Sequence, residues 1–230
     1  MSLQLGVQSL RSAPSRAAVV VDHPALLKRR PGRPTCAEAE ALRDAILNAA
    51  MRSFMDRGFE ASSMDGIARD AGVARMTLYR HFASKEEMFQ HVTRRAQLKV
   101  CTRIEQAIDL SRPFKDVLRD IIGALYDSYT HPDYVATFRM VAAESRRFPK
   151  LGRAMFNDMK LFSQPLIRYL GQLQKQGVIA ISTPLEAAIQ VSGMASGAGR
   201  YQLVSPSRHP VSRKHWVDSL TELFVRAWQA

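Results

Sequence analysis

The stretch SMDGIARDAGVARMTLYRHFASK, from Ser63 to Lys85, decides the fold of this chain. Its apolar spacing predicts two short helices joined by a sharp turn at Ala71-Gly72-Val73, because glycine supplies the backbone freedom that such a turn needs. In the second helix, Leu78 and Phe82 are spaced for burial, whereas the other positions carry mostly polar side chains that face outward. This combination favours a helix-turn-helix.

The outward side chains of the second helix are candidate contacts for DNA. A helix-turn-helix places this helix in the major groove, where arginine can hold guanine through two hydrogen bonds and a threonine or methionine methyl group can touch thymine. Residues at the starts of the first helix and of the helix after the motif are placed for phosphates, which set register and affinity. The candidates in this stretch are Ser63, Arg75, Met76, Thr77, Tyr79, Arg80, His81 and Lys85.

A second interpretation of this stretch stays open. Two amphipathic helices around a glycine turn occur in many helical proteins, and Tyr79 would then be a half-buried core residue whose hydroxyl reaches water. The gathering of Arg, Thr, Tyr and His on one short helix favours DNA binding over that interpretation.

Composition and charge narrow the class of protein. With 46% apolar and 23% charged residues, the chain of 230 residues can bury a core, which excludes wholesale disorder. The net charge of +12 favours a polyanionic partner, either nucleic acid or an anionic membrane surface. No apolar run approaches the roughly 20 residues of a membrane span. We therefore expect a cytoplasmic protein with no membrane partner.

A basic arm precedes the first predicted helix. The first 35 residues carry six Lys or Arg and one Asp, and they end in KRRPGRP at 28–34. Gly32-Arg33-Pro34 resembles the core of AT-hook peptides, in which an extended arginine enters a narrow A·T-rich minor groove. We therefore add Arg33 to the candidate DNA contacts. The alternative is a charge run that only keeps the chain in solution.

The remaining sequence predicts helix throughout, because no strand-like alternation persists. We expect an all-α fold of about nine helices. Pro165 lies inside a helical pattern and predicts a kink or break there, and the last helix spans roughly Ser212 to Trp228. Predicted helix starts, each with a capping side chain, are Thr35, Ser63, Ser84, Asp133 and Thr183.

The sequence carries no pattern of a catalytic or metal site. Its six histidines are scattered without paired-ligand spacing, and it has neither a phosphate loop nor a nucleophile elbow. We expect no enzyme, no cofactor and no metal. Cys36 and Cys101 lack ligand spacing, so we expect free thiols, with a disulfide between them as the alternative. A non-specific DNA-binding protein that uses only the basic arm would leave the C-terminal half unexplained.

The stretch from Ala41 to Phe89, which contains AILNAAMRSFMDRGFEASSMDGIARDAGV and TLYRHFASKEEMF, resembles the DNA-binding domain of TetR-family transcription regulators. Ala74 departs from the family pattern, since members often place Ser or Thr there, and the lost cap costs about 1 kcal/mol. Met76 and Arg80 stand where members vary. A second segment, AAESRRFPKLGRAMF at 142–156, resembles the AefR-like subgroup around its Glu-x-x-Arg-Phe-Pro pattern.

The resemblance implies a ligand-responsive repressor. It implies a homodimer whose two recognition helices read a palindromic operator, with half-sites about one helical turn apart. It also implies that a small molecule, apolar or aromatic given the few polar groups among the candidates, binds the C-terminal domain and releases the DNA. The expected regions are a flexible arm at 1–34, a helix-turn-helix domain at 35–83 and a ligand-binding and dimerisation domain at 84–230.

Two groups of residues follow from that expectation, each with a plain alternative. Pocket residues would otherwise be ordinary core, and interface residues would otherwise pack within one subunit. The candidate pocket residues are Leu98, Ile122, Tyr126, Tyr129, Phe138, Val141, Phe156, Met159 and Phe162. The candidate dimer residues are Gly193, Gly197, Trp216, Leu220 and Phe224, which combine close helix approach with bulky apolar contact.

Overall fold

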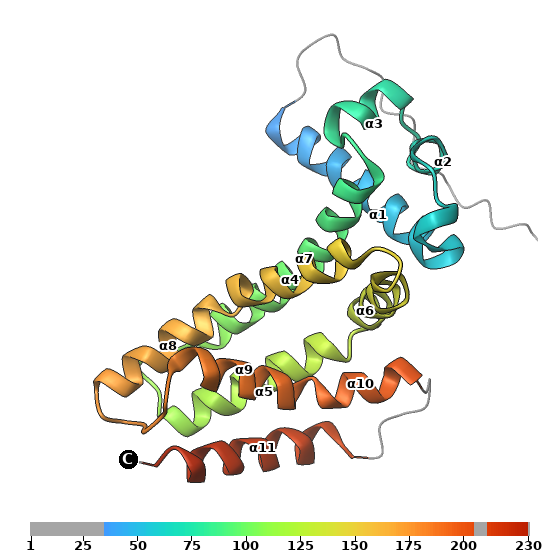
Figure 1. Cartoon of the computed structure of the whole chain (residues 1–230). Coiled ribbons are helices and arrows are strands. Elements are labelled where there is room, and N and C mark those ends of the chain that lie inside the picture. Colours follow the sequence, from blue (N-terminus) through green and yellow to red (C-terminus); the bar gives the residue numbers. More distant parts are fainter. Residues whose placement is uncertain (1–34, 205–210, 230) are drawn as a thin grey trace, which may run out of the picture. The chain divides into compact units, whose positions relative to one another are not determined.

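The computed structural model describes residues 35–204 and 211–229 of the chain. Within these ranges the chain forms helices and one isolated β-bridge, between Ile179 and Gln229, so the predicted all-α class is confirmed (Figure 1). The helices of the described part are α1 (Cys36–Ala61), α2 (Met64–Asp70), α3 (Arg75–His81), α4 (Lys85–Ala107), α5 (Phe114–Tyr129), α6 (Pro132–Ser145), α7 (Pro149–Phe162), α8 (Gln164–Lys175), α9 (Pro184–Ala195), α10 (Gly197–Val204) and α11 (Arg213–Ala227).

Two breaks explain why the described part holds more helices than the nine predicted. α7 ends at Phe162 and α8 begins at Gln164 with Pro165 in its first turn, as the proline predicts. The other break, at Ser196 between α9 and α10, has no proline and was not predicted. Past this break α10 packs closely on the end of α5. A Cβ on Gly199 would lie 2.2 Å from the carbonyl oxygen of Tyr129, so only glycine fits there.

Side-chain caps fix five of the helix starts in the described part, those of α2, α4, α6, α9 and α11. The hydroxyls of Ser63, Ser84 and Thr183 accept the N–H three residues later at 3.1, 3.1 and 3.2 Å, which confirms the predicted starts of α2, α4 and α9. The prediction for Asp133 was wrong. α6 begins at Pro132, and the His131 ring accepts the N–H of Asp133 at 3.2 Å, because proline takes the first helical position and moves the cap before itself.

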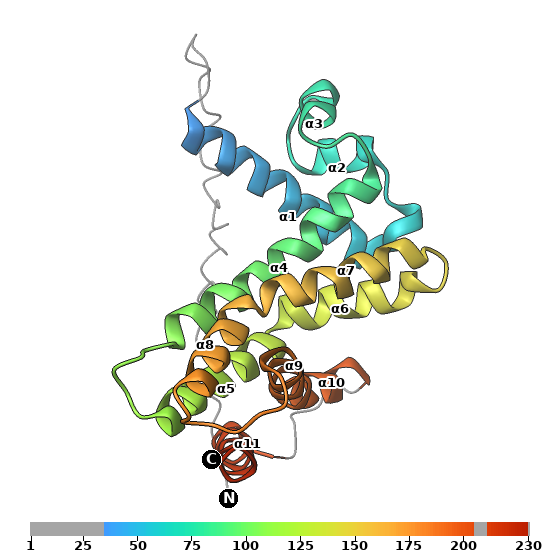
Figure 2. The ribbon, with the colours of Figure 1, turned by 60° about the vertical axis from the view of Figure 1, so that its left-hand side comes forward.

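The N-terminal helices, α1–α3, form a core that later helices complete. α1 kinks at Gly58, whose φ of 81° lies in the left-handed region, and Phe59 then turns inward to 1% exposure. The buried cluster around Phe59 also contains Met140 and Val141 of α6 and Leu151 and Met155 of α7. Figure 2 shows α7 running alongside α4, with α6 beside them. The N-terminal core is therefore shared with helices far along the sequence.

The C-terminal helices, α4–α11, surround a second core. It is built from leucine, isoleucine and valine side chains of α5, α8 and α9, among them Ile121, Leu170 and Val191, each at 0% exposure. α11 lies against α5 and buries Leu220 and Phe224 on that core. The two clusters share α4, whose first turns bury Met88 and Phe89 in the N-terminal core and whose later turns serve the other.

Candidate functional site

The helix-turn-helix forms as predicted, with α3 as its second helix. Gly72 has a φ of 68°, and the N–H of Val73 closes the turn on the carbonyl oxygen of Ala68 at 3.0 Å. α3 begins after Ala74, which offers no side-chain cap. Its sequence RMTLYRH buries only Leu78, at 0% exposure, and Phe82 at the end of the helix is buried as well. These two apolar side chains fix the orientation of α3.

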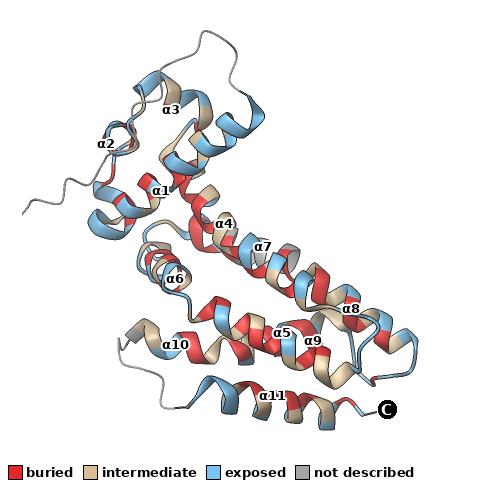
Figure 3. Cartoon of the chain, turned by 180° about the vertical axis from the view of Figure 1, so that it is seen from behind, coloured by how far each residue is buried: buried red, intermediate tan, exposed pale blue. Residues whose placement is uncertain are grey.

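The remaining residues of α3 are exposed or half-buried (Figure 3). Met76 is 79% exposed and Tyr79 is 38% exposed, both large for apolar side chains on a packed helix. Arg75 and Arg80 are exposed, and Thr77 is half-buried. Few residues of α3 pack on the core, and most of the others are exposed to solvent. This is the arrangement expected of a helix that presents side chains to a partner.

Arg75 is held by α2 before any partner arrives. Its Nε lies 3.0 Å from Oδ1 of Asp65 in an ion pair, and its guanidinium lies 5.4 Å from the centre of the Tyr79 ring. Both partners of the ion pair are more than half exposed, so the pair stabilises the fold by at most about 1 kcal/mol. Such a weak pair can orient Arg75 and still release it to a base or a phosphate.

Two other predicted contacts are constrained by neighbours. Partial burial, helped by Arg80 and Arg43, lowers the pKa of His81, so its ring is mainly neutral at pH 7 and one nitrogen can donate to a phosphate. Lys85 donates to the carbonyl oxygens of Glu60 and Ser62 at 3.0 and 2.9 Å. The same Nζ lies 4.5 Å from the centre of the Phe59 ring, so Lys85 is held against the end of α1 and its phosphate contact stays a prediction.

The predicted pocket residues lie in different places. Leu98 lines an open groove beside α1, whereas Tyr129 and Phe138 line a smaller pocket between α5, α6, α9 and α10. Ile122 is fully buried in the C-terminal core, and Val141 is buried in the N-terminal one. Their part in ligand binding stays a prediction.

The remaining pocket candidates lie outside both cavities or outside the described side chains. Tyr126 packs half-buried on the C-terminal core, and Phe162 is buried between α7 and α8. The side chains of Phe156 and Met159 lie outside the described residues, as does Arg33 of the basic arm.

Most of the predicted dimer residues have partners within the chain. A Cβ on Gly197 would lie 3.1 Å from Cζ2 of Trp216, so this glycine makes the predicted close approach to α11 of the same chain. Leu220 and Phe224 are buried in the C-terminal core. Gly193 instead opens onto the smaller pocket, with no atom within 4 Å of a Cβ placed there. A role of these residues between subunits stays a prediction.

The smaller pocket is mostly apolar, with a volume of about 260 Å³. Tyr129 reaches it from α5, and burial raises the pKa of this phenol to about 12, while a hydrogen bond from Ser192 opposes the shift. The phenol is therefore neutral at physiological pH. Of the predicted pocket residues, Tyr129 and Phe138 line this cavity. Gly193, which was predicted for the dimer interface, lines it as well, and Ser192 and Arg200 of α9 and α10 were not predicted.

A junction that the sequence did not predict joins α6 to the end of α1. The carboxylate of Glu144 accepts the backbone N–H of Phe59 at 3.0 Å. Arg147 pairs with Glu60, and the rings of Phe148 and Phe59 meet edge to face at 5.0 Å between their centres. Glu144, Arg147 and Phe148 are the Glu-x-x-Arg-Phe of the AefR-like pattern, so this motif holds the N-terminal helices to α6.

The described part of the chain bears on three further expectations, which concern metal ligands, disulfides and membrane spans. In residues 35–204 and 211–229, no group of three His, Cys, Asp or Glu is placed to hold a metal ion. Cys36 and Cys101 are both free thiols. Of the described helices, none is both long and apolar enough to cross a membrane.

Comparisons with known proteins agree with this geometry. Residues 46–92 match the family of bacterial regulatory proteins, tetR family. Residues 116–230, half of the chain, match the C-terminal domain of AefR-like transcriptional repressors. The first match contains the whole helix-turn-helix, and the second contains the α6 junction and the smaller pocket.

Individual relatives are regulators of transcription. The chain is 25% identical over 143 residues to the HTH-type transcriptional regulator UidR of Escherichia coli K12, which covers 62% of this chain and 71% of UidR. It is 29% identical over 164 residues to the HTH-type transcriptional repressor BepR of Brucella suis, covering 69% and 78%. The solved structure of the flavonoid-responsive regulator FrrA covers 83% of this chain and 98% of FrrA at 28% identity, with a TM-score of 0.67.

The exposed α3, the packed turn behind it and the two family matches lead to one conclusion. UidR and BepR are named as HTH-type regulators of transcription, FrrA is named as a regulator, and none of the three is described as an enzyme. The chain belongs to the TetR family of DNA-binding transcriptional regulators, with an AefR-like C-terminal domain.

Proposed function

We propose that the protein is a ligand-responsive repressor that binds a palindromic operator as a homodimer in the cytoplasm. The observation that carries this proposal is α3, which buries Leu78 and leaves Arg75, Met76 and Tyr79 open to a partner. Its relation to BepR and to AefR-like repressors supports repression over activation.

A palindrome requires two recognition helices, and the outer surfaces of α9 and α11 support a dimer. Met194 of α9 and Leu223 of α11 are 40% and 47% exposed there. Large apolar side chains gathered on neighbouring helices favour a protein contact over solvent. α9 and α11 also pack against one another in the chain, so their outer faces would form one continuous interface.

The smaller pocket is the proposed effector site. Its lining is mainly apolar, and Tyr129, Ser192 and Arg200 supply a few polar atoms, which is the usual composition of a small-molecule site. Its volume of about 260 Å³ favours a small, largely aromatic or apolar molecule with one or two hydroxyl or carbonyl groups. The description of FrrA as flavonoid-responsive supports the same chemistry.

α6 supplies a route from this pocket to the DNA. Tyr134 and Phe138 of α6 line the pocket, and Glu144 near its other end holds the backbone of Phe59. A ligand that shifts α6 would therefore shift α1, on which α2 packs, and with it α3, which packs on α2. The two half-site helices would then no longer match the operator spacing.

The three predicted regions complete the proposal: an arm at 1–34, a DNA-binding domain at 35–83 and a ligand-binding and dimerisation domain at 84–230. Arg33 would add a minor-groove contact beside the major-groove helix. The core of the second region continues into α4 as far as Val92, so the boundary at 83 marks the end of the motif rather than the end of a core.

Selection of bound duplexes from a random pool tests the proposal. The full chain should enrich a palindrome, and Tyr79→Ala or Thr77→Ala should abolish the enrichment. Leu110→Ala, which removes an apolar side chain that is 60% exposed in the α4–α5 loop, is the control and should select the same sequence. A non-specific DNA-binding protein would retain affinity without enrichment, and that result would overturn the proposal.

Filling the effector pocket tests the ligand response separately. A Cβ at Gly193 meets open space, so Gly193→Leu should fit into the pocket and abolish release of the operator by an aromatic effector. Light scattering on the same sample should still give a dimer. Undiminished release from the operator would place the effector elsewhere.

A further inference from the structure

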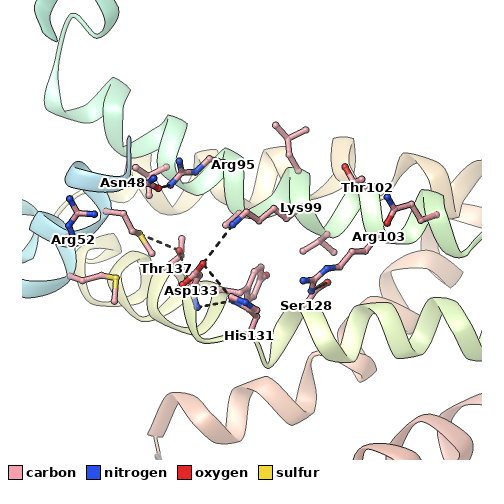
Figure 4. Close-up of a pocket in the computed structure, with 18 residues that line it drawn as sticks. Asn48, Arg52, Arg95, Lys99, Thr102, Arg103, Ser128, His131, Asp133 and Thr137 are labelled. Carbon is pink, nitrogen blue, oxygen red and sulfur yellow. Dashed lines mark hydrogen bonds and ion pairs between the residues drawn. The ribbon is translucent and has the colours of Figure 1, made fainter. Parts of the chain in front are cut away.

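A second cavity, the hinge groove, lies between α1, α4 and the turn from α5 to α6 (Figure 4). Its volume is about 760 Å³, and its lining is strongly basic. The basic residues Arg52, Arg95, Lys99, Arg103 and His131 face a single acidic lining residue, Asp133.

Three of the cations form a stripe along α4. Arg95, Lys99 and Arg103 recur at steps of four residues, so they share one face of the helix. Like charges at this spacing repel one another. The stripe therefore stores a repulsion that an anion would relieve.

Arg95 already pairs with Asp44 at 3.5 Å and donates to Asn48 at 2.8 Å, whereas the partners of Lys99 and Arg103 are weak or neutral. Lys99 lies 3.8 Å from Asp133, and both side chains are more than 60% exposed. Arg103 donates to the hydroxyl of Ser128 at 3.2 Å, which leaves its charge uncompensated by that bond. Guanidinium groups bind carboxylates and phosphates through paired hydrogen bonds, so the groove is chemically suited to such an anion.

The groove also exposes apolar side chains next to these charges. Met55 and Leu98 are both 48% exposed, although side chains of this size usually find cover. Val92 and Val100 complete an apolar strip in the lining. A ligand that satisfies the whole groove therefore combines an anionic group with an apolar body.

The hinge groove differs in chemistry from the proposed effector pocket. The pocket has Arg200 as its only basic lining residue among those described, and its walls are otherwise apolar or hydroxylic. Tyr134 lines both cavities and is the one residue that they share. The two cavities are therefore neighbours with separate ligand preferences.

We propose that the hinge groove binds an amphiphilic organic anion, with its carboxylate or phosphate on Lys99 and Arg103 and its apolar body over Leu98 and Met55. This site lies outside the proposed effector pocket. Its test needs neither DNA nor a dimer, so it can fail while the proposed function holds, and the reverse is also possible.

Titration calorimetry on the full chain tests the site with probes of matched length, kept below the concentration at which they form micelles. Octyl phosphate and octanoate should bind, whereas octanol and inorganic phosphate should bind at least tenfold more weakly. Equal binding of octanol would remove the role of charge, and equal binding of inorganic phosphate would remove the role of the apolar body. Either result would overturn the proposal, and so would a failure of both octyl phosphate and octanoate to bind.

Variants locate the binding on the molecule. The double variant Lys99→Gln/Arg103→Gln should weaken the binding of octyl phosphate at least tenfold. The matched control is Arg168→Gln/Lys175→Gln on α8, which makes the same change of charge on exposed side chains away from the groove and should stay within twofold. Gly193→Leu should also leave octyl phosphate binding unchanged. Equal loss in the control, or loss only in Gly193→Leu, would contradict the assignment.

Discussion

The two cores of the molecule are built differently. The C-terminal core consists largely of leucine, isoleucine and valine side chains from α4–α11 themselves. The N-terminal core is richer in phenylalanine and methionine, and it takes Met140, Val141, Leu151 and Met155 from α6 and α7. The N-terminal helices thus depend on the C-terminal ones for a complete core, whereas the reverse dependence is small. A change in α6 or α7 therefore reaches the DNA-binding helices through direct packing.

The largest expected effect comes from Phe59, at the centre of the shared core. Its ring contacts those of Phe54, Phe89 and Phe148, with centres 5.5, 5.1 and 5.0 Å away. Phe59→Ala should lower the free energy of unfolding by about 3–5 kcal/mol, measured by urea denaturation, and should weaken operator binding. Leu170→Ala, in the C-terminal core, should lower the free energy of unfolding by a similar amount. It should leave the packing of α2 and α3 unchanged. If both variants retained full stability, the packing described here would be wrong.

The next largest loss of stability is expected from changes at Glu144. Glu144→Ala leaves the backbone N–H of the buried Phe59 without its acceptor, which costs about 1–3 kcal/mol. It should also uncouple effector binding from operator release. Glu144→Gln keeps an acceptor oxygen and should restore most of the stability in the same denaturation assay.

Arg147→Gln provides the comparison at the same junction. It removes only an exposed pair with Glu60, worth at most about 1 kcal/mol. A loss in Arg147→Gln equal to that in Glu144→Ala would mean that charge, rather than the buried amide, holds the junction.

A smaller effect is expected at the DNA-binding surface. Asp65→Asn removes a negative charge from α2 and frees Arg75. Operator affinity should rise several-fold at low salt and converge with the unchanged protein at high salt. Asp70→Asn, which removes the partner of Arg57 at the other end of α2, is the matched control. Reduced affinity in Asp65→Asn would show that the ion pair positions Arg75 for the bound state.

The smallest expected effect is a pH dependence of the free energy of unfolding that arises in the N-terminal core. The pKa of His91 is lowered by burial and by Arg43 and Arg94, while Glu87 opposes the shift. Because the unfolded chain then binds more protons than the folded one, stability should fall as the pH drops through about 6.5 and below. Urea denaturation between pH 7.5 and 5.5 measures this fall, and His91→Gln should reduce it. His81 shifts in the same direction and will retain part of the dependence.

Local patterns predicted much of this structure. The caps at Ser63, Ser84 and Thr183, the turn at Gly72 and the break at Pro165 each depend on neighbouring residues, and all are confirmed. The predictions that failed or were incomplete involve either two neighbouring residues that compete for one structural role or contacts between segments far apart in the sequence. A proline beside Asp133 moved the cap to His131.

Contacts between distant segments were beyond local patterns. The carbonyl acceptors of Lys85 lie 23 and 25 residues earlier in the chain, and the acceptor for Phe59 lies 85 residues later. The basic stripe of the hinge groove, Arg95, Lys99 and Arg103, was not predicted, although its four-residue spacing is present in the sequence. Arg52 and His131 join it only once α1 and the α5–α6 turn are placed.

The bond between Glu144 and Phe59 has one more consequence. Its donor is a main-chain N–H, so the contact is independent of the side chain at position 59 and places a single exchangeable proton at the meeting point of two distant segments. That proton can exchange for deuterium only when α6 and the end of α1 separate. Its exchange rate therefore reports how often they part, with and without DNA or a small molecule, in the unmodified protein.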